Sequence, residues 1–354
     1  MAKRLSVVVS QGQSPNPVKR KLEEDIITTL MLEPGIDVTV VPHLYDIRPE
    51  STGHLALNGL PGNVVVVSWL YERASRWTLN RMGVMGKPGT VLLELPDGDE
   101  DAEEDEAVEE DLSRVAANRQ VPNRFIYCLD FRASNKPHEF VEEIKRIKSD
   151  NQVDVLSNGS GLGGLPILSG NGSTNRASAP EGQPESENGS PHDVTATINR
   201  IEDQAGRRWY PVIDFSRCTN CMECIDFCLF GVYGVDPMET ILVEQPDNCR
   251  KGCPACSRVC PENAIMFPQH KTPAIAGANE AAEAMKIDLS QLFGAPSSEN
   301  SLEVAAAERD EQLRLAGRDE VGMSVGIPKR QSENNDQPRD RLDDLVDQLD
   351  QLDL

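Results

Sequence analysis

The sequence predicts an α/β N-terminal domain with an open, mostly parallel sheet, followed by a small cysteine-rich domain. Three observations lead to this prediction. Short β-branched runs alternate with helical patterns over residues 1–150. Eight of the nine cysteines lie between Cys218 and Cys260. Residues 151–205 are rich in Gly, Ser and Asn, which predicts a flexible linker between the two domains.

The first domain is expected to contain five strands and three helices. β-branched or continuous apolar runs predict strands at 5–10, 36–41, 64–69, 90–95 and 124–129. The run at 64–69 is apolar almost throughout, as expected of a central strand that is buried on both faces. Helical spacing predicts helices at 17–32, 70–81 and 137–148, and Pro17 suits the first turn of its helix.

Two acidic segments are expected to be solvated. Eleven of the fifteen residues at 97–111 are acidic, so mutual repulsion predicts an extended loop there. The tail over 276–354 has few apolar residues, and only 279–293 and 342–352 have helical patterns. We therefore expect the cysteine-rich domain over 206–275 to be followed by an acidic, largely disordered tail with short helices. We also expect the two folded domains to be independent of each other.

Charge and hydropathy exclude several classes of partner. A net charge of −23 argues against binding to nucleic acid, which requires clustered Lys and Arg. The sequence has no apolar run long enough for a membrane-spanning helix. The apolar stretch at 5–9 is too short for a signal peptide, so we expect a cytoplasmic protein with no membrane partner. In that compartment, packed cysteines bind metal more often than they form disulfides.

The cysteines form two runs that repeat each other. The first begins at Cys218 and has the spacing C-x2-C-x2-C-x3-C. The second begins at Cys249 and has the spacing C-x3-C-x2-C-x3-C-P. Zinc is the main alternative to iron–sulfur, but four-cysteine zinc sites usually present two C-x2-C pairs rather than two runs of four.

These runs resemble those of the bacterial-type two-cluster (2×4Fe–4S) ferredoxins over about residues 209–268. The resemblance implies a small α+β ferredoxin-like domain with two 4Fe–4S clusters as cofactors. In that family the fourth cysteine of each run reaches the cluster of the other run. The resemblance therefore implies one cluster held by Cys218, Cys221, Cys224 and Cys260, and another held by Cys249, Cys253, Cys256 and Cys228.

The chain departs from the family pattern at two places. The first run ends in Cys228-Leu229, where the family usually has Cys-Pro. The second run begins one residue longer than usual, and we expect Gly252 to accommodate the extra residue in a left-handed turn. A longer loop costs more to order, so we expect the cluster of the second run to be the more labile.

The first domain weakly resembles a flavodoxin-like sheet. Its loop after the first strand lacks both the flavodoxin phosphate-binding pattern and G-x-G-x-x-G. Ligands of such sheets lie at the carboxyl ends of the strands, where the possible site residues are Gln11, Gly12, Ser14, Ser68 and Trp69.

Two function classes remain open. The first is a ferredoxin-type electron carrier that exchanges single electrons with redox partner proteins and has no catalytic residues of its own. The second is an oxidoreductase component, in which the clusters feed a site on the first domain or on a partner subunit. A bound flavin in the purified protein would favour the second class. The oligomeric state stays open.

Overall fold

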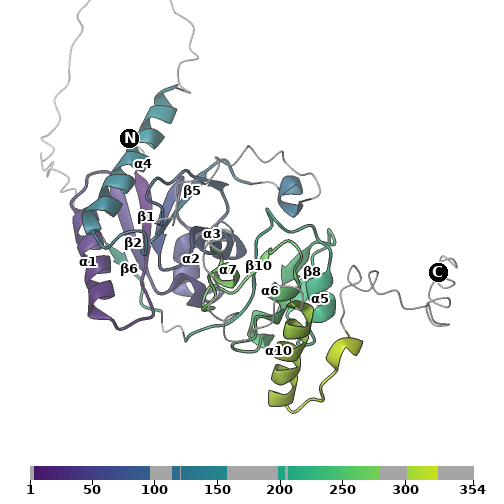
Figure 1. The fold of residues 1–354 in the computed structure, drawn as a ribbon. Helices are drawn as coiled ribbons and strands as arrows, with labels where there is room; N and C mark the ends of the chain where they lie inside the picture. The colour runs from purple at the N-terminus through teal and green to yellow at the C-terminus, as the bar shows by residue number, and fades with distance from the viewer. Residues whose placement is uncertain are drawn as a thin grey trace, which may run out of the picture.

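The computed structural model describes residues 4–95, 114–119, 121–157, 198–203, 206–278 and 301–325. Its N-terminal domain is built on a six-stranded sheet in the order β4-β5-β3-β1-β2-β6, and every pair of neighbours is parallel (Figure 1). The strands are β1 (Leu5–Ser10), β2 (Ile36–Val41), β3 (Val64–Ser68), β4 (Lys87–Pro88), β5 (Phe125–Asp130) and β6 (Asn199–Arg200). The predicted open, parallel sheet is therefore confirmed.

Helices cover both faces of this sheet. On one face lie α1 (Pro17–Met31) and α4 (Pro137–Ser157), which pack on the inward side chains Val7 and Val9 of β1. On the other face lie α2 (Thr52–Asn58) and α3 (Glu72–Arg81), which pack on Val8 and Val66. Because β1 and β3 are buried on both faces, their sequences read as continuous apolar runs.

The prediction of a strand at 90–95 is wrong. The short strand is β4, and its pairing with β5 ends where the Gly89 N–H donates to the carbonyl of Ile126 at 2.9 Å. Beyond that point the backbone N–H of Leu92 donates to the Glu143 carboxylate of α4 at 2.8 Å, so it is not available for a strand ladder. The apolar residues at 90–95 contact α4 instead of forming a strand, since Val91 is buried in the hydrophobic core that α4 shares with the sheet.

Part of the expected linker joins the sheet. Strand β6 pairs in parallel with β2 through Thr39 and Asn199, which extends the sheet by one strand. Of the expected linker at 151–205, the structure describes only 151–157, at the end of α4, and 198–203. The whole acidic loop at 97–111 lies outside the described residues. The helical patterns at 279–293 and 342–352 also lie outside them.

The cysteine-rich domain repeats one small unit. Strand β7 (Val212–Ile213) pairs antiparallel with β10 (Ile265–Met266), and β8 (Tyr233–Val235) pairs antiparallel with β9 (Ile241–Val243). Each cysteine run leads into a five-residue helix, α5 (Glu223–Phe227) or α6 (Ala255–Val259). Short helical turns complete the described chain: η1 (Leu44–Asp46), η2 (Val115–Asn118), η3 (Pro246–Asn248), α7 (Pro273–Ala276) and η5 (Gly322–Ser324).

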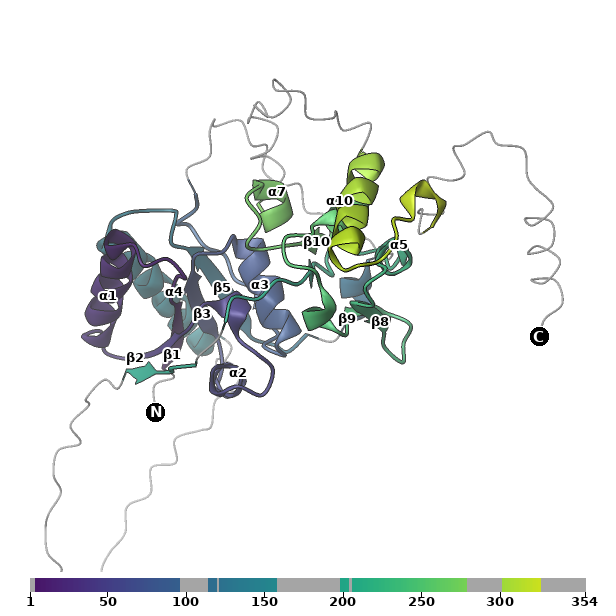
Figure 2. The ribbon, with the colours of Figure 1, turned by 90° about the horizontal axis from the view of Figure 1, so that it is seen from below.

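The two domains share one hydrophobic core, so the expectation that they are independent is wrong. Helix α3 lies between the sheet and the cysteine-rich domain (Figure 2). Trp77 of α3 packs edge-on against Phe215, with ring centroids 5.7 Å apart. Tyr45 stacks on Tyr210 at 4.2 Å, and the Tyr210 hydroxyl donates to the carbonyl of Tyr45 at 2.8 Å. The two domains are therefore packed together through these contacts.

The tail contains a helix that the sequence analysis did not predict. Helix α10 (Ser301–Leu315) packs against α6 at one flank of the cysteine-rich domain (Figures 1 and 2). Its buried face is made of Ala305, Ala306, Arg309, Asp310 and Leu313. This face is small and contains a charged residue, so it does not give the apolar stripe that predicts a surface helix. None of the described helices has the length and apolarity needed to cross a membrane.

Candidate metal centres

The eight clustered cysteines line two cavities. Each cavity is lined by three cysteines of one run and the fourth cysteine of the other run. One cavity, called here the first cavity, is lined by Cys218, Cys221, Cys224 and Cys260. The other, called here the second cavity, is lined by Cys249, Cys253, Cys256 and Cys228.

Left-handed backbone conformations wrap each loop around its cavity. In the first run, Asn220 and Met222 have φ values of 60° and 63°. In the second run, Gly252 has a φ of 90° and no atom near the position of a Cβ. Asn220 and Gly252 both come directly before the second cysteine of their run, so the two loops turn at the same place. The expectation that Gly252 accommodates the longer loop in a left-handed turn is confirmed.

The two short helices carry the fourth cysteines away from their own loops. Cys228 comes directly after α5, and Cys260 comes directly after α6. The Cys228 N–H donates to the carbonyl of Cys224 at 3.1 Å, which closes the last turn of α5. A helix of five residues advances by about 7 Å, which moves the fourth thiol from one cavity to the other.

Burial and mutual repulsion make these thiols unfavourable as free thiolates. Burial raises the pKa of Cys224, and the neighbouring charges of Cys260, Cys218 and Cys221 raise it further. Burial likewise raises the pKa of Cys218 to about 11 and that of Cys253 to about 11. Four thiolates that line one cavity therefore need a positive group between them, as a bound metal provides.

Hydrogen bonds to sulfur fit a metal-bound thiolate. The backbone N–H of Ala264 donates to Cys260 Sγ at 3.3 Å, and the hydroxyl of Tyr233 donates to Cys256 Sγ at 3.0 Å. Within the described part of the chain, no group of three or more His, Cys, Asp or Glu side chains has the geometry needed to bind a single metal ion. Each set of four thiols instead surrounds a cavity, so the donor set fits an iron–sulfur cube better than a lone zinc ion.

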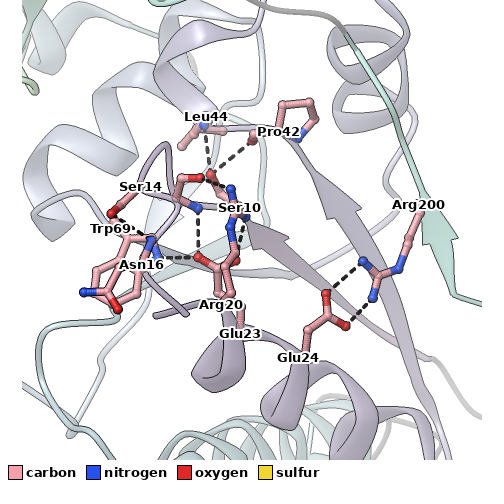
Figure 3. A network of polar contacts seen from close by, with 11 residues as sticks. Ser10, Ser14, Asn16, Arg20, Glu23, Glu24, Pro42, Leu44, Trp69 and Arg200 are labelled. Carbon is pink, nitrogen blue, oxygen red and sulfur yellow. Dashed lines mark hydrogen bonds and ion pairs between the residues drawn. The ribbon is translucent and has the colours of Figure 1, made fainter. Parts of the chain in front are cut away.

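The possible ligand site of the first domain is filled by a residue that sequence reasoning missed. Glu23 of α1 lies between the carboxyl ends of β1 and β3, where its Oε1 accepts from Gly12 N at 2.9 Å and from Trp69 Nε1 at 2.7 Å (Figure 3). Arg20 pairs with the other Glu23 oxygen at 3.0 Å and donates to the Gly12 carbonyl at 2.7 Å. The Glu23 side chain is only 1% exposed. An acid within the apolar stripe of α1 was the available sequence signal.

The other predicted residues of that site have local structural partners. The backbone N–H of Gln11 donates to the carbonyl of Val41 at 3.0 Å, and the Ser14 hydroxyl accepts from Asn16 N at 3.3 Å. Ser68 is fully buried, and its hydroxyl donates to Ser75 Oγ at 3.4 Å. The structure therefore brings Gly12 and Trp69 together around Glu23, whereas Ser68 points into the core beneath α3.

A comparison with curated proteins identifies two relatives in Methanocaldococcus jannaschii. An uncharacterized ferredoxin is 48% identical over 66 residues, which are 18% of this chain and 44% of that protein. The pyruvate synthase subunit PorD is 35% identical over 69 residues, which are 19% of this chain and 78% of PorD. The chain thus spans less than half the length of the first relative. No family model and no solved structure matches the chain. Because most of PorD is matched, the chain belongs to the ferredoxin-type family over the matched residues.

Proposed function

We propose that this protein binds two 4Fe–4S clusters, one in each cavity, and passes single electrons between redox partner proteins. One observation carries the proposal: each cavity is lined by three cysteines of one run and the fourth of the other. This crossed arrangement is the one that two-cluster ferredoxins use. It also places the two clusters side by side, because α5 and α6 each span from one cavity to the other.

The residues of the chain would hold each cube without taking part in bond chemistry. A 4Fe–4S cube held by four thiolates supplies one-electron transfer and has no open position for a substrate. The cysteines bind it, the backbone N–H of Ala264 and the hydroxyl of Tyr233 donate to sulfur, and the apolar lining excludes water. We therefore assign the cysteines a ligand role and propose no catalytic residue.

The partner is proposed to be a protein. PorD is named as a subunit of pyruvate synthase, so one relative works within a multi-subunit assembly. The alternative, in which the clusters feed a cofactor on the first domain, has a physical obstacle. Glu23 occupies the crevice at the ends of β1 and β3, and its carboxylate would repel the phosphate of a flavin nucleotide.

Metal analysis of anaerobically purified protein tests the proposal directly. We expect about eight irons and eight sulfides per chain and no stoichiometric flavin. Cys128→Ala is the matched control, because Cys128 lies in the core of the first domain, where burial raises its pKa to about 12. This variant should keep all eight irons. Colourless protein with stoichiometric zinc, obtained with iron supplied, would overturn the proposal.

Electron paramagnetic resonance of the reduced protein tests the crossed arrangement. Cys228→Ser should damage the same signal as Cys253→Ser, because both thiols line the second cavity. Cys221→Ser should damage the other signal, although Cys221 and Cys228 belong to the same run. If Cys228→Ser and Cys221→Ser remove the same signal, the fourth cysteine serves its own run and the crossed assignment is wrong.

A further inference from the structure

Helix α10 covers the second cavity with residues that lie outside the ferredoxin-like domain. Leu302 and Ala305 of α10 pack against Phe227, Ala255 and Val259, which belong to α5 and α6. Ala305 is fully buried in this contact. Figure 1 shows α10 directly beside α6. The tail thus contributes one wall to the second cavity.

Arg309 places a buried positive charge in that wall. Its side chain is 2% exposed and lines the second cavity together with the four cysteines. Its guanidinium lies over the ring of Phe227, 4.6 Å from the centroid. It donates to the carbonyls of Val325 and Gly322 at 2.9 and 2.5 Å. These bonds hold the guanidinium in one orientation, so its charge stays at the cavity.

The neighbouring charges do not all act in the same direction. Asp310 pairs with Arg309 at 3.2 Å but does not line the cavity. Glu308 lies near Cys253 and pairs with Arg258 of α6 at 3.0 Å, and both of these side chains are partly exposed. Arg250 also lines the cavity but is exposed, so water and salt screen its charge. Among these groups Arg309 is the buried cation that lines the cavity wall.

Effects on the cysteines agree with this placement. Burial raises the pKa of Cys228, whereas backbone N–H groups and then the charge of Arg309 lower it. At Cys253, where burial again dominates, the charge of Glu308 raises the pKa and that of Arg309 lowers it. Arg309 therefore stabilises negative charge at Cys228 and Cys253, and at Cys253 the charge of Glu308 opposes it.

We propose that Arg309 tunes the cluster of the second cavity, raising its reduction potential above the value that the cysteine-rich domain alone would give. The inference rests on the proposed function. Reduction by a one-electron donor adds one negative charge to the cluster, and a nearby buried cation favours the charged product. Arg309 acts through the field at the cluster and through the seal that α10 makes, so it is a positioning residue rather than a ligand.

A redox titration followed by electron paramagnetic resonance measures the effect. Arg309→Gln should lower the potential of the second cluster and leave the first unchanged. At a fixed solution potential, we expect the ratio of reduced to oxidised second cluster to change about tenfold. This corresponds to a shift of about 59 mV in its one-electron reduction potential. Arg309→Lys should restore most of the potential because it keeps the charge. Arg314→Gln, on the exposed end of the same helix, should change neither cluster.

Glu308→Gln separates a charge effect from a loosened helix. It removes the Arg258 pair and weakens the docking of α10, but it also removes a negative charge near Cys253. A charge effect predicts that Glu308→Gln raises the potential of the second cluster while Arg309→Gln lowers it. If both variants shift the potential in the same direction, α10 acts only as a cover and the proposal is wrong.

The outcomes also separate this inference from the proposed function. If wild-type protein lacks eight irons or a second cluster signal, the proposed function has failed. If wild-type protein has both clusters and Arg309→Gln retains both with an unchanged potential, only the role of Arg309 has failed. If Arg309→Gln loses its second cluster, Arg309→Lys and Glu308→Gln still give the sign of the effect, and a fall in potential in Glu308→Gln refutes it.

Discussion

Removing Arg73 should destabilise both domains at once. Arg73 of α3 pairs with Asp214, which lies four residues before Cys218, with Nε and Oδ2 2.5 Å apart. The Arg73 side chain is 10% exposed and that of Asp214 is 2% exposed. Asp214 also accepts from Ser216 N at 2.9 Å, and its backbone carbonyl accepts from Cys218 N at 3.0 Å. This ion pair thus joins the first domain to the loop of the first cavity.

The magnitude follows from the burial of both partners. Arg73→Met leaves the Asp214 carboxylate in the interface with only the more distant Arg217, whose Nε lies 3.8 Å from Oδ2. Removal of one partner of a buried pair costs about 3–5 kcal/mol, and we expect the lower end because Arg217 remains. With a urea slope of about 3 kcal/mol/M, the unfolding midpoint should fall by about 1 M. Asp214→Asn in the same chain removes the charge that Arg73 compensated, so the double variant should be more stable than Arg73→Met alone.

Anaerobic urea unfolding checks this, with far-ultraviolet circular dichroism and cluster absorbance followed on one sample. Because the two domains share a core, both signals should be lost at the same, lowered midpoint. Arg4→Met is the matched control: Arg4 pairs with Asp37 at 2.7 Å, but their side chains are 40% and 47% exposed, so the cost should be below about 1 kcal/mol. A loss for Arg73→Met no larger than for Arg4→Met would refute the reasoning.

Two further variants test groups at the strand ends of the first domain. Burial, together with the charges of Glu94 and Asp130, raises the pKa of Glu72 to about 7. Between about pH 4.5 and 7 the folded state therefore binds one more proton at Glu72 than the unfolded state does. The free energy of unfolding of the wild type should fall as the pH rises through this range. Glu72→Gln should therefore be more stable than wild type at pH 8 by about 1–2 kcal/mol, but not at pH 4, in thermal unfolding at both pH values. Glu23→Ala removes the acceptor of Gly12 N and Trp69 Nε1 and should lower the free energy of unfolding by about 2–4 kcal/mol. Glu23→Gln keeps an acceptor oxygen and should lower it clearly less. Equal losses for the two variants in urea unfolding would contradict this reasoning.

The sequence predicted the elements whose pattern is local. The β-branched runs at 5–10 and 36–41 coincide with β1 and β2, and the helical spacing after Pro17 coincides with α1 to within a residue. The structure also brings the cysteines together in the two groups that the resemblance implies, and their assignment as cluster ligands stays a prediction.

The features that were missed depend on contacts distant in sequence. Strand β6 consists of two polar residues, and its place is determined by the free edge of β2 rather than by its own side chains. From the sequence, Arg309 is expected to be a surface residue. In the structure it is buried, and it donates to the carbonyls of Val325 and Gly322, which come later in the chain. Glu23 stands within the apolar stripe of α1, but its partners are the Gly12 loop and Trp69, which lie outside that helix. The sequence around a buried charge does not identify its partners, because they come from elsewhere in the chain.

The two cavities are supported by different parts of the chain. The loop of the first cavity is bonded to the first domain: Val115 N donates to the carbonyl of Cys218 at 2.9 Å, and Arg73 pairs with Asp214. The second cavity is closed by α10, from the tail. A cysteine-rich domain of about 60 residues is too small for an adequate apolar core of its own. Each flanking segment thus covers one half of the cysteine-rich domain. A destabilising substitution in α3 should therefore cause loss of the first cluster before the second, and one in α10 should cause loss of the second before the first.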